Sequence, residues 1–176
     1  KRAEIFVECF EKINQNFNRI YTGFLNGNAQ LSLTNPQKPL ESGMMVEARH
    51  GSESKLKNLD SMSGGEKSLT SLALIFAIQM YEPAPFYFFD EVDAALDKTN
   101  SMKIALLIKE MSRHSQFISI THNDAVVKAA DQIIGVAKNN QNSSVIGLKI
   151  RPEDVKSFSV SNANGPSSGQ DATAGY

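Results

Sequence analysis

The sequence predicts an α/β domain in which a largely parallel sheet is flanked by helices. From residue 63 onward, helical and strand patterns alternate, which is typical of parallel strands joined by crossover helices. The run Phe86–Phe89 is unbroken and apolar, as expected of a strand that is covered on both faces. The chain has 176 residues, of which 41% are hydrophobic, so it is long enough to form one complete core.

A helix and a hairpin are predicted before this alternation. Residues 1–24 carry apolar side chains at the spacing of a helix with one buried face, and Gly23 and Gly27 are expected to end it. Residues 28–49 then change to strand patterns and are divided by a Pro-containing loop at 35–43. This arrangement predicts a hairpin or a meander.

The alternating part begins with a helix over residues 65–81, which is apolar nearly all round and is therefore expected to be buried on most sides. The elements predicted after it are a strand at 86–89, a helix over 98–112, a strand at 117–120, a short helix over 124–130, and strands at 133–136 and 145–150. Residues 157–176 are rich in Ser, Asn, Gly and Ala, which predicts a disordered tail.

Composition argues against several classes of protein. The 18 basic and 19 acidic residues give a net charge of −1, unlike a protein that binds nucleic acid through overall basic charge, although a local basic patch stays open. The single cysteine, Cys9, cannot form an intrachain disulfide, and with three histidines it leaves no zinc site of the usual kind. The longest apolar stretch, residues 69–81, is too short to span a bilayer. Because the chain starts at Lys1 inside a helical pattern, we expect it to be a fragment.

The segment Ser63-Gly64-Gly65-Glu66 opens the long apolar helix. One interpretation is a capping box, in which the side chains of Ser63 and Glu66 each bind the backbone N–H of the other residue. The two glycines, however, cost about 1 kcal/mol each relative to alanine. A second interpretation is therefore an anion site, because bare N–H groups at a helix N-terminus suit a phosphate.

Asp90 and Glu91 follow the aromatic run directly, at the carboxyl end of the expected strand, where open α/β sheets bind ligands. This is the Walker B pattern, in which Asp90 would hold Mg²⁺ and Glu91 would orient and deprotonate an attacking water. Taken alone, the same string also fits a strand that ends in a solvated turn, and both interpretations stay open.

Further polar residues follow in order. Asp93 and Asp97 lie in the next segment, and Asp97 also suits the N-cap of the helix that follows. The next strand ends in Thr121-His122-Asn123. A histidine at that place can hydrogen-bond a terminal phosphate, or it can be a structural turn residue.

The order of these motifs resembles the C-terminal half of an ABC-type ATPase head. The segments SMSGGEKSLTSLALIFAIQ and PAPFYFFDEVDAALD, followed by ITHN, are similar to the structural maintenance of chromosomes (SMC) family. Membrane-transporter ATPases differ, because Gln usually follows their two glycines and Pro usually follows their carboxylate pair. The resemblance is close over residues 55–136 and looser in the flanks.

The resemblance implies the C-terminal lobe of an ABC-type P-loop ATPase head, preceded by a β-hairpin and by a helix at the root of a coiled-coil arm. The implied binding residues are Ser63, Gly64, Gly65 and Glu66 in the signature loop, which contacts ATP held by the opposite head, and Asp93 and Asp97 in the D-loop at the dimer interface. Asp90 would be the metal ligand, and Glu91 and His122 would be the catalytic residues. The implied domains are residues 1–27, 28–156 and 157–176.

A complete P-loop ATPase also needs the Walker A motif G-x-x-x-x-G-K-[ST], and this sequence has none. In the SMC family this motif lies at the other end of a long polypeptide, beyond two coiled-coil arms and a hinge. The resemblance therefore implies half of an ATP hydrolase. Alone, this half should bind ATP weakly and hydrolyse none.

The implied cofactors are ATP and Mg²⁺. The implied partners are the N-terminal head lobe of the same polypeptide, a second SMC head in an ATP sandwich, a kleisin subunit near residues 133–150, and DNA, with no membrane. The implied location is the chromosome, in a cytoplasmic nucleoid or a nucleus, and the implied role is condensation, cohesion or segregation. Two alternatives remain: the head lobe of a related coiled-coil DNA-repair ATPase, and a non-catalytic kleisin-binding scaffold.

Overall fold

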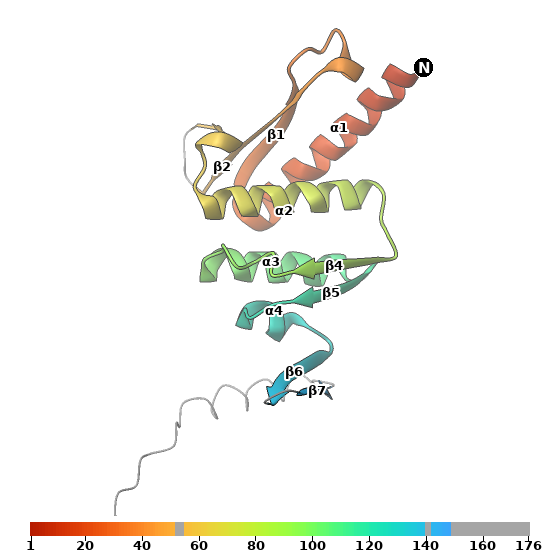
Figure 1. The fold of residues 1–176 in the computed structure, drawn as a ribbon. Helices are drawn as coiled ribbons and strands as arrows, with labels where there is room; N and C mark the ends of the chain where they lie inside the picture. The colour runs from red at the N-terminus through yellow and green to blue at the C-terminus, as the bar shows by residue number, and fades with distance from the viewer. Residues whose placement is uncertain (52–54, 140–141, 149–176) are drawn as a thin grey trace, which may run out of the picture. The chain divides into compact units, whose positions relative to one another are not determined.

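The computed structural model describes residues 1–51, 55–139 and 142–148. The chain divides into two units, residues 1–129 and a second unit that begins at residue 130, of which residues 130–139 and 142–148 are described (Figure 1). The predicted tail at 157–176 and the last two residues of the strand predicted at 145–150 lie outside the described residues.

The first unit begins with helix α1 (Arg2–Ile20), which continues as a π-helical turn, Tyr21–Leu25. The prediction that Gly23 ends the helix is wrong, because the chain stays helical through it. Asn26 ends the turn instead, with a φ of 53° in the left-handed region that asparagine tolerates. Gly27 then starts the first strand, and a Cβ there would collide with the backbone carbonyl of Arg49.

A three-stranded antiparallel sheet follows, with strand order β1-β2-β3. The strands are β1 (Gly27–Leu33), β2 (Met44–His50) and the short β3 (Lys57–Asn58). The register pairs Ala29 with Ala48, and both residues are fully buried. The predicted hairpin or meander is confirmed by β1 and β2, and β3 is a third strand that was not predicted.

Helix α2 (Gly64–Tyr81) packs against α1 at the centre of the first unit. Phe17 and Tyr21 of the first helical segment and Leu69 and Phe76 of α2 belong to one buried cluster. The prediction that α2 is buried on most sides is confirmed, because seven of its residues are buried and six more are partly buried. One side is exposed, where Ile75 and Ile78 are 44% and 46% exposed. In the part of the chain that the structure describes, no element covers that side.

Two parallel strands, β4 (Phe86–Asp90) and β5 (Gln116–Ile120), are connected by helix α3 (Lys98–Met111), and α4 (Asp124–Ala129) follows. One face of the pair packs on α2, where the Phe76 ring lies 5.7 Å from that of Phe89 and 6.1 Å from that of Phe117. The other face is open, with Phe86 and Phe88 59% and 57% exposed. The expectation of a strand covered on both faces is therefore wrong.

The prediction of a largely parallel sheet also needs correction. Among the described residues, β4–β5 is the one parallel pairing, and the other strand pairs are antiparallel. Only these two strands are joined through a crossover helix, which parallel pairing requires. The second unit holds the antiparallel hairpin of β6 (Ile133–Asn139) and β7 (Asn142–Leu148). Its two strands confirm the last two predicted strands, with β7 beginning earlier than expected.

Candidate functional site

The N-terminus of α2 carries a complete capping box. The Ser63 N–H donates to Glu66 Oε2 at 2.8 Å, and the Glu66 N–H donates to Ser63 Oγ at 3.4 Å. The hydrogen bond from the Ser63 backbone is the largest cause that lowers the pKa of the Glu66 carboxyl. Lys57 Nζ lies 3.5 Å from Glu66 Oε1, so β3 helps to hold this turn. The capping interpretation is confirmed.

Capping alone does not explain the two glycines, and the structure separates their roles. A Cβ at Gly65 would lie 3.2 Å from the carbonyl oxygen of Ala95, so this glycine permits close approach of the segment that follows β4. A Cβ at Gly64 would meet nothing within 4 Å. Gly64 therefore leaves open space over the exposed first turn of α2, as a ligand that approaches the backbone N–H groups would require.

Asp90 and Glu91 lie where β4 ends and the chain turns. Glu91 has a φ of 48°, which is uncommon for a residue with a side chain. Its N–H donates to the Ile120 carbonyl at 2.9 Å, and its own carbonyl accepts from the Ala94 N–H at 3.1 Å. A tight turn therefore begins at Glu91. We call residues 91–97 the carboxylate turn.

The structure brings Glu91 and His122 together. His122 Nε2 lies 3.3 Å from Glu91 Oε1, at the carboxyl ends of the two parallel strands. Both side chains are open to solvent, at 53% exposure for Glu91 and 90% for His122. A substrate can therefore reach a carboxylate that could act as a base and an imidazole that could donate a hydrogen bond.

Asp93, in the same turn as Glu91, is only 5% exposed. Thr121 Oγ1 donates to Asp93 Oδ2 at 2.6 Å, and the Asn123 N–H donates to Thr121 Oγ1 at 2.9 Å. Our sequence reasoning missed Thr121, because only the histidine of Thr121-His122-Asn123 was considered. A hydroxyl at the end of one strand and a carboxylate just after the neighbouring strand were the available signal.

Asp97 is the N-cap of α3, as its position in the sequence suggested. The Asn100 N–H donates to Asp97 Oδ1 at 2.8 Å, and Asn100 Nδ2 donates to Asp97 Oδ2 at 3.2 Å. Both carboxylate oxygens are thus engaged within the chain. Asp97 shapes the end of the carboxylate turn.

A hollow of about 210 Å³ lies over the carboxylate turn and the end of β5. Its lining residues are Glu91, Asp93, Ala94, Leu96, His122 and Asn123. Pockets that enclose a whole small molecule usually measure about 300–1,000 Å³, so this hollow suits only part of a ligand. Among residues 1–51, 55–139 and 142–148 there is no group of three His, Cys, Asp or Glu that could hold a metal. A Mg²⁺ ion on Asp90 would need oxygen ligands from a nucleotide and water, which is how Mg²⁺ is usually bound.

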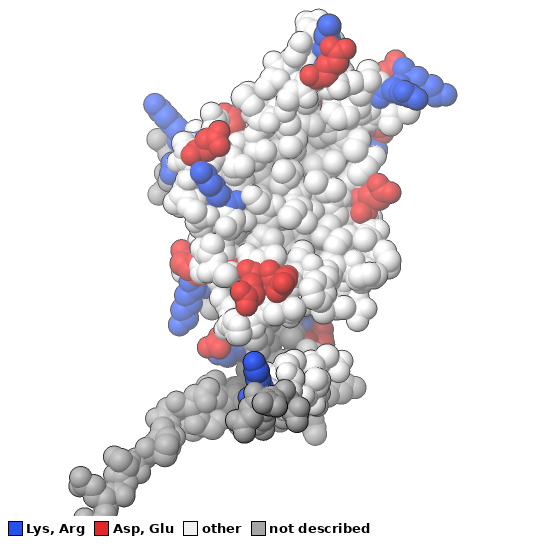
Figure 2. All heavy atoms as spheres, in the orientation of Figure 1, with Lys and Arg blue, Asp and Glu red and all other residues white. Residues whose placement is uncertain are grey.

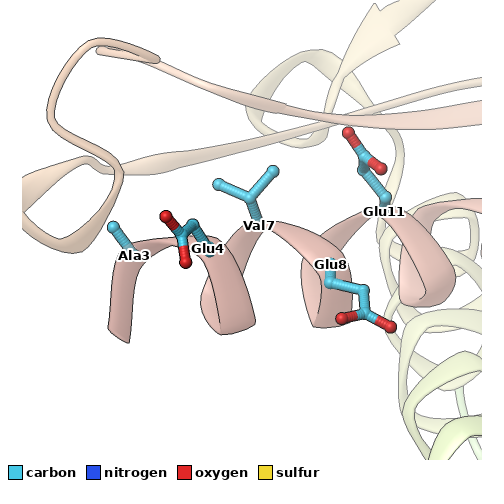
Figure 3. Close-up of a pocket in the computed structure, with 5 residues that line it drawn as sticks. All are labelled: Ala3, Glu4, Val7, Glu8 and Glu11. Carbon is cyan, nitrogen blue, oxygen red and sulfur yellow. The ribbon is translucent and has the colours of Figure 1, made fainter. Parts of the chain in front are cut away.

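A larger hollow, of about 450 Å³, lies away from these residues along α1 (Figure 3). It is lined by Ala3, Glu4, Val7, Glu8 and Glu11 of that single helix. Charge elsewhere is dispersed: on the face shown in Figure 2, basic and acidic side chains form small separate groups on a mostly uncharged surface. None of the described helices is long and apolar enough to cross a membrane.

The mixed α/β fold that carries these residues matches solved SMC structures. A solved structure described as "Structural biochemistry of ATP-driven dimerization and DNA stimulated activation of SMC ATPases" superimposes with a TM-score of 0.81 at 40% identity, over 94% of this chain and 99% of that chain. The family described as "RecF/RecN/SMC N terminal domain" matches residues 11–145. The chain belongs to this family.

Relatives of known name are consistent with this assignment. The chromosome partition protein Smc of Methanocaldococcus jannaschii is 47% identical over 85% of this chain, and that of Pyrococcus furiosus is 44% identical over 85%. The Smc head domain of Pyrococcus furiosus, solved bound to the C-terminal domain of ScpA, gives a TM-score of 0.79 at 42% identity, over 92% of this chain and 40% of that chain. The chain spans only 13% of the length of the two Smc relatives.

Proposed function

We propose that this chain is the C-terminal lobe of an SMC ATPase head and supplies half of an ATP-hydrolysing site. The observation that carries the proposal is the exposed pair of Glu91 and His122, 3.3 Å apart at the carboxyl ends of two parallel strands. The sequence has no Walker A motif, and the chain matches less than half of the Pyrococcus furiosus head structure. Both facts support a lobe and not a complete head.

The roles follow from the chemistry of each side chain. Asp90 is the expected Mg²⁺ ligand, and the ion would neutralise charge that develops on the phosphates of ATP. Glu91 is the expected base that takes a proton from the attacking water. His122, held beside Glu91, is the expected hydrogen-bond donor to the terminal phosphate.

The first turn of α2 is the expected contact for ATP bound by a second head. Ser63 and Gly64 are exposed. The backbone N–H groups of this turn lie at the N-terminus of α2, where the helix dipole favours a negatively charged ligand. Gly65 lies next to the carboxylate turn, because a Cβ there would be 3.2 Å from the Ala95 carbonyl oxygen. We therefore expect Asp93 and Asp97, as members of that turn, to place the loop at the interface between two heads.

The N-terminal lobe of the same polypeptide is the proposed cover for the open face of β4–β5. This face presents Phe86 and Phe88 from β4 and Ile118 and Ile120 from β5. Four apolar side chains on one face of a two-stranded sheet need a partner, because such a pair is marginally stable without cover. The hollow along α1 similarly fits a second helix of a coiled-coil arm, packed over Ala3 and Val7.

A kleisin subunit is the proposed partner of the second unit. In the β6–β7 hairpin, Ile134, Val136 and Val145 are 62–69% exposed, and the register places Val136 opposite Val145.

Because the whole protein would act on chromosomes, we expect it to contact DNA and to be chromosome-associated. The dispersed charge in Figure 2 offers no concentrated basic surface on that face, so DNA contacts are expected to involve other parts of the protein as well.

Substitution of Ser63 tests the two-head arrangement. In a head assembled from this chain and its N-terminal lobe, Ser63→Arg should retain ATP binding but weaken ATP-dependent association of heads at least about ten-fold, or 1.4 kcal/mol. The added bulk and positive charge would fill the place of the phosphate. Sedimentation with and without ATP measures association. Ser112→Arg, the same change at the far end of α3, is the matched control, and equal association of both variants would contradict the proposal.

A further inference from the structure

Two hydrogen bonds attach the carboxylate turn to the end of β5, close in the chain to Glu91 and His122. The Glu91 N–H donates to the Ile120 carbonyl at 2.9 Å. Thr121 Oγ1 donates to Asp93 Oδ2 at 2.6 Å. Thr121, which precedes His122, therefore holds Asp93, which lies two positions after Glu91.

The orientation of the Thr121 hydroxyl is fixed by its neighbours. Its oxygen accepts the Asn123 N–H at 2.9 Å, so its single proton is directed to Asp93. Asn123 Oδ1 in turn accepts the Ala125 N–H at 2.9 Å, at the start of α4. Asp93 is only 5% exposed, and a buried carboxylate is costly without a hydrogen-bond donor. This bond is therefore expected to persist.

Glu91 needs such support, because its left-handed backbone is a conformation that non-glycine residues keep only when their surroundings enforce it. The Ala95 carbonyl of the same turn lies so near Gly65 that a Cβ there would be 3.2 Å from its oxygen. A shift of the carboxylate turn would therefore move Glu91 away from His122 and would also disturb the first turn of α2.

We propose that Thr121 is a positioning residue for ATP hydrolysis: through Asp93 it holds the carboxylate turn so that the Glu91 carboxylate stays beside the His122 imidazole. The proposal rests on the proposed function of this chain as half of an ATPase site. Thr121 itself does not touch the reacting atoms. It acts on where the base and the histidine lie.

The test compares Thr121→Val, which keeps the shape but removes the hydroxyl, with Thr121→Ser, which keeps the hydroxyl. In the head assembled with the N-terminal lobe, we expect Thr121→Val to lower kcat about ten-fold or more, because small displacements of reacting groups are costly, with KM for ATP unchanged within about two-fold. Thr121→Ser should restore most of the lost kcat. Thr22→Val, which removes an exposed hydroxyl from the helix end, is the matched control and should leave kcat unchanged.

A second measurement does not depend on hydrolysis. In the chain alone, Glu91→Gln should shift the imidazole NMR signals of His122, and Thr121→Val should shift them as well, whereas Thr121→Ser should not. Unchanged signals and an unchanged kcat in Thr121→Val would overturn the positioning role. Equal losses in the Val and Ser variants, or a raised KM with normal kcat, would overturn it too. If the unmodified head does not hydrolyse ATP, the proposed function fails, and the NMR comparison still decides the role of Thr121.

Discussion

The core around α2 and the outer face of the β4–β5 strand pair both consist of large apolar residues, but those of the core are buried and those of the strand pair are exposed. Phe17, Tyr21 and Phe76 in the core are 0% exposed, whereas Phe86 and Phe88 of β4 are more than half exposed. The cluster of buried residues is closed within this chain, with one side of α2 exposed, whereas the outer face of the strand pair has no cover among the described residues. The buried cluster is therefore formed by this chain itself, and the exposed apolar face is where we propose that the N-terminal lobe packs.

Polar groups show the same contrast. The Tyr21 hydroxyl is hydrogen-bonded to Thr70 Oγ1 at 2.5 Å, with both residues fully buried, and Thr70 Oγ1 also lies 3.4 Å from Met62 Sδ. Glu91 and His122 form their contact in the open. A buried, satisfied hydrogen bond serves the stability of the fold, and an exposed pair is available for chemistry.

Replacing one phenylalanine by alanine in the core and one in the strand pair is expected to give the largest difference in the free energy of unfolding between the two regions. Phe76→Ala should lower the free energy of unfolding by about 3–5 kcal/mol, because it leaves a cavity against Phe89 and Phe117. Phe88→Ala should change the stability of the chain alone by no more than about 0.5 kcal/mol. Denaturant unfolding measures both values.

Binding of the N-terminal lobe is a second property in which these two variants should differ. Phe88→Ala should weaken binding of that lobe in calorimetric titration, since it removes apolar area from the proposed contact face. Normal binding by this variant, or equal destabilisation of the chain alone by both substitutions, would contradict the distinction between a complete core and an open strand pair.

A smaller effect is expected from the buried hydroxyl of the core. Tyr21→Phe should cost about 1 kcal/mol of stability, because it removes one hydrogen bond to Thr70. The ordinary pKa of a tyrosine is about 10. In the folded chain the pKa of Tyr21 is raised well above this value, mainly because the hydroxyl is buried. The unfolded chain therefore loses this proton first.

That difference sets the pH dependence. The stabilising effect of the neutral Tyr21 is fully present below about pH 10 and declines as the pH rises toward the folded-state pKa. Unfolding followed between neutral and alkaline pH should show this decline in the unmodified chain and a reduced decline in Tyr21→Phe. The same slope in both proteins would contradict burial of the hydroxyl.

The sequence predicted what depends on local spacing. The capping box at Ser63 and Glu66 is set by a fixed three-residue separation, and the N-cap at Asp97 by its place before a helix. The meeting of Glu91 and His122 followed from topology, because the carboxyl ends of adjacent parallel strands lie together.

Other features depend on information that spacing does not carry. The helix passes Gly23 and ends at Asn26, which adopts the left-handed conformation. Glycine adopts that conformation even more easily, so residue type alone does not place the helix end. Burial of Phe88 was predicted from its apolar neighbours, but burial also requires a covering element, and none of the described residues provides it. The bond between Thr121 and Asp93 joins residues 28 positions apart, and only their places at the ends of neighbouring strands, not their spacing, indicate that they could meet.

The most direct test of the central claim, that this chain is half of an ATPase site, is ATP turnover over a range of protein concentrations. The chain is assayed alone and mixed with its N-terminal lobe, with Glu91→Gln as the inactive control. The account predicts no turnover alone and, after mixing, turnover that rises more steeply than linearly with concentration, because two assembled heads must meet. Turnover by the chain alone, or none in either case, would contradict it.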